Sequence, residues 1–153
     1  MAGRKYEKYI VTELKQNLGS TGWHGTVPAA EKGKGGRILY LDSDIVPEAH
    51  YTEALWLTPD LHDDNGEGKA KRKRGVEAHT HDYEEILAYF GTDLQNPHDL
   101  GAEIEFWMED EKYILTKSCM IFIPAHVRHC PLRILSISRP IFHFSTSPLK
   151  KYF

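Results

Sequence analysis

The chain has 153 residues, of which 41% are hydrophobic and 27% charged, so a disordered tail is excluded and one soluble globular domain is favoured. Its 19 basic and 22 acidic residues give a formal net charge of -3, which argues against a dedicated nucleic-acid-binding protein. No apolar run approaches the roughly 20 residues of a membrane helix, and no secretory signal is expected. With only two cysteines, a disulfide scaffold is excluded and a cytoplasmic protein is expected.

Residues 1–36 are expected to form an N-terminal arm of strand and loop, ahead of a barrel over residues 37–153, within one domain overall. Residues 31–36 are rich in glycine and charge and predict a flexible connector. The segment Lys8–Glu13 contains the apolar run Tyr9-Ile10-Val11 and is a candidate strand. An unpaired edge strand invites pairing with another chain, so we expect a homodimer that this arm contacts.

The remaining segments mainly predict strands, because they are short, rich in β-branched or aromatic residues and bounded by turn residues. They cover residues 37–41, 53–57, 103–108, 112–116, 119–123 and 140–144. Between the second and third of these, residues 62–75 carry an acidic half and then a basic half, which predicts a solvated loop in preference to a polyanion contact. Many short strands separated by turns predict an all-β sandwich or barrel.

Histidines concentrate in the segment 75–91. On a strand, His79, His81, Tyr83 and Glu85 would share one face, with Glu84 on the other. A second segment, residues 122–131, offers a turn followed by His129, which completes three imidazoles and one carboxylate if the two segments are neighbours. This set suits Fe, Mn, Ni, Zn or Co and leaves coordination positions open. The alternative is a solvated polar strand.

Two motifs carry a family resemblance. The first is spelled by Gly75, His79, His81, Glu85 and Gly91, and the second by Pro124 and His129. With these residues the chain resembles the small single-domain cupins of the cupin superfamily. The second motif departs from the usual form, with His126 in place of a glycine, Ser118 in place of the opening glycine and Arg133 in place of the closing asparagine. The resemblance covers residues 75–133 directly and implies a jelly-roll β-barrel with a divalent transition metal inside.

The resemblance implies a metal-dependent enzyme of the dioxygenase, isomerase or lyase type that acts on a small polar molecule in the barrel. In that reading the metal acts as a Lewis acid, while Glu105, Tyr83 or a bound water moves a proton. The alternative is a non-catalytic binding or sensor module whose metal is structural. Neither reading includes a nucleic acid or a membrane as partner.

Several other residues have open or modest expectations. In residues 103–108, either Glu105 and its neighbours two residues away line the cavity, or the opposite face does. His126 is expected to be a turn residue, with a ligand role as the alternative, and His143 a hydrogen-bonded core histidine. Cys130 would face away from His129 in a regular strand and is expected to pack, not to act as a nucleophile.

Overall fold

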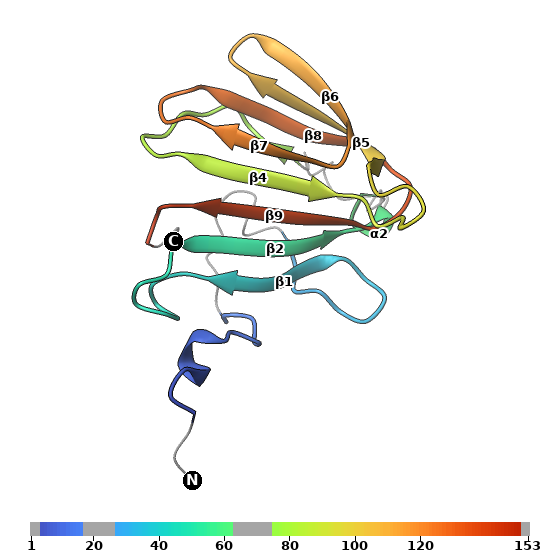
Figure 1. Ribbon diagram of the computed structural model, residues 1–153. Coiled ribbons are helices and arrows are strands. Elements are labelled where there is room, and N and C mark those ends of the chain that lie inside the picture. The colour runs from blue at the N-terminus through green and yellow to red at the C-terminus, as the bar shows by residue number, and fades with distance from the viewer. Residues whose placement is uncertain (1–3, 17–26, 63–74, 151–153) are drawn as a thin grey trace, which may run out of the picture.

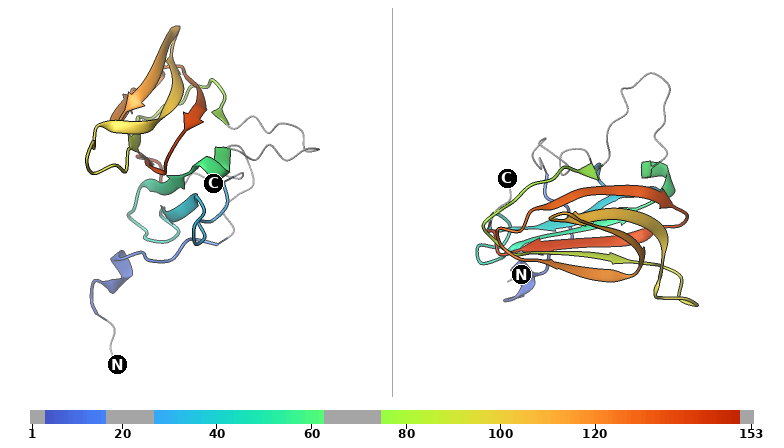
Figure 2. Two further views of the ribbon diagram at one scale, coloured as in Figure 1. Left: turned by 90° about the vertical axis from the view of Figure 1, so that its right-hand side faces the viewer. Right: turned by 90° about the horizontal axis from the view of Figure 1, so that it is seen from above.

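The computed structural model describes residues 4–16, 27–62 and 75–150, and these residues form two antiparallel sheets. The larger sheet contains, in spatial order, β1 (Gly36–Leu41), β2 (Tyr51–Leu57), β9 (Ile141–Ser147), β4 (Glu85–Phe90) and β7 (Cys119–Ile123), as Figure 1 shows. The smaller sheet contains β3 (Gly75–Val76), β8 (His129–Ile137), β5 (Asp99–Met108) and β6 (Glu111–Lys117). Figure 2 shows the smaller sheet lying against one face of the larger one.

This architecture of two packed antiparallel sheets confirms the expected all-β fold. Each of the six segments predicted as strands overlaps an observed strand, from β1 and β2 through β5, β6 and β7 to β9. The described helices are the 3-10 turn η1 (Glu7–Tyr9) and the short α2 (Pro59–His62). In the described part of the chain, no helix is long and apolar enough to cross a membrane.

The core lies between the two sheets and follows from strict alternation of buried residues. In β2 every second residue from Tyr51 to Leu57 is buried, and in β9 every second residue from Ile141 to Ser147. Apolar side chains of β4, β5 and β8, among them Tyr89, Phe106 and Leu132, complete one cluster that joins the sheets. Burying apolar surface in this way is the main favourable term in folding.

The alternation of buried and more exposed residues in β5 shows which face of this strand points into the core, a question that the sequence left open. Ala102, Ile104 and Phe106 are buried in the core, whereas Glu103 is exposed and Glu105 only partly covered. The acidic residues of β5 therefore point away from the interior, and the apolar ones fill it.

The N-terminal arm differs from its prediction. Residues 4–16 extend away from the sheets below β1 (Figure 1), and Lys8–Glu13 is not a strand. The backbone N–H of Tyr9 donates to the Tyr6 carbonyl at 3.0 Å, which closes a 3-10 turn, and no described strand pairs with this segment. Further along, Lys15 Nζ lies 2.6 Å from Asp42 Oδ2 and ties the arm to the β1–β2 connection. Most of the charged loop predicted at 62–75 lies outside the described residues.

Candidate metal centre

The predicted metal ligands converge from both sheets. His79 and His81 lie in the segment between β3 and β4, Glu85 begins β4, and His129 begins β8. His79 and His129 pair through two backbone hydrogen bonds of 3.0 Å, and the N–H of His126 donates to the His81 carbonyl at 2.8 Å. These bonds hold the two motif segments side by side. Residues 77–84 do not form a continuous strand, so His79, His81 and Glu85 do not share a strand face as predicted. The three residues nevertheless lie close together.

The potential ligand atoms of these side chains lie close to one another. Glu85 Oε2 is 3.4 Å from His81 Nε2 and 3.6 Å from His129 Nε2. One ligand atom each of His81, Glu85 and His129 lies within 4.8 Å of the others, the spacing of groups that could hold one ion. The ring of His79 lies beside them, with its centroid 4.3 Å from that of His129 and 5.7 Å from that of His81.

All three imidazoles are held in one tautomer by the backbone. The Nδ1–H groups of His79, His81 and His129 donate to the carbonyls of residues 77, 83 and 127, at 2.7, 2.7 and 2.9 Å. A carbonyl oxygen only accepts, so the ring proton sits on Nδ1 and Nε2 keeps its lone pair in the neutral ring. This is the arrangement by which proteins orient a metal-binding histidine.

A buried nitrogen without a partner shows that the residues fit a metal ion. His129 is 1% exposed, and its Nε2 has no hydrogen-bond partner among the described residues. Leaving such an atom unpaired in the interior costs free energy. The Nε2 atoms of His129 and His81 and the carboxylate of Glu85 together form a donor set suited to Fe, Mn, Ni, Zn or Co.

The electrostatics of the cluster keep Glu85 ionised. Burial raises the pKa of Glu85, but the imidazoles of His129 and His81 beside it outweigh burial and hold the pKa below its usual range. Burial lowers the pKa of His129, and Glu85 and the Val127 carbonyl outweigh it and raise the pKa. Glu85 therefore offers a carboxylate, the form that a cation requires.

Of the two residues proposed to move protons, the structure brings only Tyr83 to the histidines. The Tyr83 ring stacks on His81 with centroids 4.0 Å apart and planes 1° apart. Glu105 lies on the outer face of β5, where it accepts a 2.9 Å hydrogen bond from Trp107 Nε1 and lies 3.7 Å from Arg133 Nη1. The β5 register separates Glu105 from the cluster, because the inward positions of that strand belong to apolar residues.

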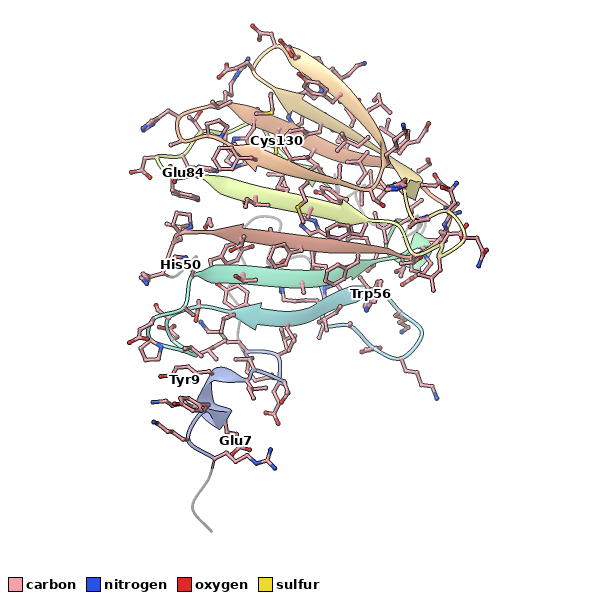
Figure 3. All side chains as sticks on the ribbon, viewed as in Figure 1. Glu7, Tyr9, His50, Trp56, Glu84 and Cys130 are labelled. Carbon is pink, nitrogen blue, oxygen red and sulfur yellow. The ribbon has the colours of Figure 1, made fainter. Side chains whose placement is uncertain are left out.

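His126 and His143 have structural roles. His126 is exposed and has φ of +67°, a left-handed turn conformation, which explains why the motif normally has glycine there. His143 is buried in β9, its Nδ1–H donates to the Ala88 carbonyl at 3.0 Å, and its ring stacks on Tyr89. Both placements agree with the expectations from sequence. Glu84 is exposed, as predicted (Figure 3).

Cys130 was expected to face away from His129, and this was wrong. It is buried, and its sulfur lies within 4.8 Å of ligand atoms of His79 and His129. Phe106 pairs with Leu132 but Met108 pairs with His129, so β8 carries one extra residue at this point, and Cys130 itself has φ of +67°. This bulge turns two consecutive side chains inward. Burial raises the pKa of Cys130 to about 12, so the thiol is neutral and a poor nucleophile, as expected.

Sequence reasoning missed the polar inner face that continues from the cluster. Ser145 of β9 lies opposite Leu87, and it is buried beside Glu53 of β2. Tyr51 hydroxyl and Ser145 hydroxyl are 3.0 Å apart, and Arg37 Nε lies 3.3 Å from Glu53 Oε2. The alternation of the polar His143 and Ser145 with Phe142 and Phe144 was the available signal.

Comparison with known proteins finds similarity among solved structures. No protein-family model and no curated protein matches the sequence. Among solved structures, the chain is similar to a predicted oxalate decarboxylase from Thermotoga maritima, with 13% identity over 75% of this chain and 78% of that one and a TM-score of 0.46. It is also similar to an RmlC-like cupin from Shewanella frigidimarina, with 12% identity, 82% and 87% coverage and a TM-score of 0.41.

A third similar structure is the DMSP lyase DddQ from Ruegeria pomeroyi, with 18% identity over 69% of this chain and a TM-score of 0.39. The chain spans 41% of the length of that lyase. All three TM-scores are below 0.5, so the chemistry of this chain has to be argued from its own site.

Proposed function

We propose that this cupin-like chain binds one divalent transition metal ion through His81, Glu85 and His129, with His79 as the fourth ligand. The buried, unpartnered Nε2 of His129 carries the proposal, because a metal ion would supply the partner that the described protein atoms do not. His81 Nε2 and the Glu85 carboxylate stand 3.4 Å apart beside it. His79 is the least constrained of the four, since it groups with His129 but not with Glu85.

We further propose that the metal centre is catalytic and acts on a small polar molecule, in a reaction of the dioxygenase, isomerase or lyase type. When bound, the metal would supply Lewis-acid chemistry for an oxygen-bearing substrate. The chain's own contribution is to hold Glu85 ionised, to fix the three histidine tautomers, and to place Tyr83 against His81. Because the Tyr83 ring stacks on His81 and Glu105 lies on the outer face of β5, Tyr83 is the candidate for holding a proton near the substrate.

Elemental analysis of the purified protein tests the metal site. After incubation with Fe(II), Mn(II), Ni(II) or Zn(II) and desalting, the wild type should retain about one ion per chain, and His81→Ala should lose it. His98→Ala is the matched control, because His98 is exposed between β4 and β5 and does not belong to the cluster. A wild-type protein that retains none of these ions would overturn the proposal.

Turnover requires a separate measurement. Oxygen consumption, isomerisation and β-elimination assays on panels of small hydroxy acids and hydroxy ketones should find activity that His81→Ala lacks. Stoichiometric metal without turnover on any panel would instead support the non-catalytic binding module.

The two cysteines bear on the compartment. Cys119 and Cys130 are both free thiols in the structure. Free buried thiols are typical of a reducing environment, and we propose the cytoplasm. Finding the protein in a periplasmic or secreted fraction would contradict this.

A further inference from the structure

The face of the larger sheet that is turned away from the smaller sheet is uncharged across all five strands and mainly apolar. In the first row across the sheet, Leu41 pairs with Thr52, Thr52 with Thr146, Thr146 with Ile86 and Ile86 with Phe122. Their neighbours along β2 and β9, such as Tyr51 and Ser145, are buried on the inner face, so this row points outward.

The second row alternates large and small side chains. It runs Leu39, Ala54, Phe144, Ala88 and Met120, each paired with the next. A third row, at the other end of the strands, places Trp56 and Phe90 on either side of Phe142, with ring centroids 5.5 and 6.3 Å from it. None of these outward positions in the five strands carries a charge.

An antiparallel sheet with one face in water normally alternates apolar inward and polar outward residues. The smaller sheet follows this rule, since its outer face carries Glu103, Glu105, Lys112 and Arg133. The larger sheet does not, and the side chains at its β7 edge are the most open, with Met120 70% and Phe122 59% exposed. The difference between the two outer faces marks the apolar one as a contact surface.

The size of this face is of the order that a dimer needs. Two rows of five positions and one row of three, with strands about 4.8 Å apart and rows about 7 Å apart, cover roughly 440 Å² in projection, before the relief of the side chains is added. A standard interface buries about 800 Å² per partner, whereas an exposed apolar patch on a monomer rarely exceeds a few hundred Å².

The pattern favours a second copy of this chain over another partner. A two-fold interface needs only a face that is complementary to itself, and an uncharged face has no electrostatic means to select a different protein. In the second row, the large Phe144 stands between the small Ala54 and Ala88. Ala88 is fully covered but Ala54 is partly exposed, so a copy rotated by 180° can place its phenylalanine over Ala54, as interdigitating sheet faces require.

We propose that two copies of the chain pair face to face through the outer face of β1, β2, β9, β4 and β7. This assigns the dimer contact to the sheet and not to Lys8–Glu13 of the arm. Glu85 of the candidate metal centre lies on the inner side of the same sheet, so the pairing covers the side of β4 opposite to Glu85.

Sedimentation equilibrium or light scattering after size exclusion tests the proposal on the full chain. The wild type should have twice the 17.6 kDa mass of the chain at about 20 μM, and Phe122→Glu should be a monomer. Each substitution enters a two-fold interface twice, so burying two carboxylates should raise the dissociation constant on the order of 1000-fold or more. Met120→Ser adds no charge and should raise the dissociation constant less. It serves as a second interface variant in case Phe122→Glu misfolds.

Two matched controls locate the interface. Leu135→Glu places the same charge at an exposed apolar position of β8 in the smaller sheet, and Ile10→Glu places it in the arm. Both should remain dimers. A monomeric wild type, a dimeric Phe122→Glu, or a dimer lost only in Ile10→Glu would each overturn the proposal. Circular dichroism and the retained metal of each variant show whether it is folded.

Discussion

Tyr83 contacts the candidate centre in two ways, one through its ring and one through its backbone. The ring lies parallel to the His81 imidazole, and the Tyr83 carbonyl accepts the Nδ1–H of the same histidine at 2.7 Å. Only the ring contact depends on the side chain. Tyr83 is thus both a neighbour of the site and a residue that sets the orientation of one ligand.

We expect Tyr83→Ala to weaken metal affinity about 10-fold, because partners that orient a ligand typically contribute 10- to 100-fold. Tyr83→Phe keeps the stacked ring and should bind as the wild type does. Competition titration against a chromogenic chelator measures both. Equal affinities for the alanine and wild-type proteins would show that the backbone contact alone orients His81.

Arg37 and Glu53 form a buried ion pair on the inner face of β1 and β2, with side chains 4% and 1% exposed. Removing one partner leaves a buried charge, so we expect Arg37→Met to lower the free energy of unfolding by about 3–5 kcal/mol. The double variant Arg37→Met/Glu53→Leu should recover part of that loss. Urea denaturation of the two single variants and the double variant forms the cycle, and additive losses would contradict the pairing.

At the level of single residues, the sequence predicted which side chains lie close together better than it predicted how they are held there. His79, His81, Glu85 and His129 come together, but through backbone bonds between two segments and not through strand alternation. The placement of Cys130 could not be predicted, because the bulge depends on the pairing of β8 with a distant strand. Glu105 had two equally possible faces, and only the packing of β5 between its neighbours chooses one.

At the level of elements, the end of β4 shows why a glycine closes the first motif. A Cβ on Gly91 would lie 2.0 Å from the Asp99 carbonyl oxygen, which is backbone and cannot move aside easily. The Gly91 N–H also donates to the Ser118 hydroxyl at 2.9 Å, and this hydroxyl donates to the Pro97 carbonyl. The end of β4, the start of β5 and the start of β7 therefore meet at one close contact.

We expect Gly91→Ala to destabilise the protein by about 1–3 kcal/mol, because the added methyl must push β4 and β5 apart. Gly33→Asn is the control, since Gly33 has open space around it and a φ of +77° that asparagine tolerates. Thermal unfolding should show a lowered Tm for the first variant only. An unchanged Tm for Gly91→Ala would mean that the strands separate there at no cost.

The start of β5 is also held to the β8–β9 turn by an ion pair. The Arg139 guanidinium beside Asp99, helped by the Gly101 N–H, holds the pKa of Asp99 below its usual range. A depressed carboxyl pKa adds stability above the unfolded-state value of about 3.9, and this stability is lost as pH falls through the lower folded-state pKa. Urea midpoints of the wild type should therefore fall between pH 5 and pH 2 more than those of Asp99→Asn. Parallel pH profiles for the two proteins would contradict this.

The strands themselves were predictable, because alternation and turn residues are local signals. The arm was not: its apolar run, Tyr9-Ile10-Val11, has strand-like composition, but no described strand lies beside it to complete a ladder. A strand needs a partner, and whether one is available depends on the whole fold.

At the level of the whole molecule, the two faces of the larger sheet have different proposed roles. The inner one carries Glu85 and the polar row of β9, and the outer one carries the uncharged rows that we assign to a second copy. One strand, β4, contributes to both through successive residues, with Glu85 on one side and Ile86 on the other. In the dimer, the two metal centres would then lie on opposite sides of the paired sheets.

The origin of the ligands in different sheets has a mechanical consequence. Glu85 belongs to the larger sheet and His129 to the smaller one, so a bound ion would act as a cross-link between the layers, much as a disulfide joins two segments. An ion at 100 times its dissociation constant adds about 2.7 kcal/mol to the folded state. Amide exchange should slow in β4 and β8 together on metal addition, and His81→Ala should abolish the effect. Metal binding would thus limit how far the two sheets can separate.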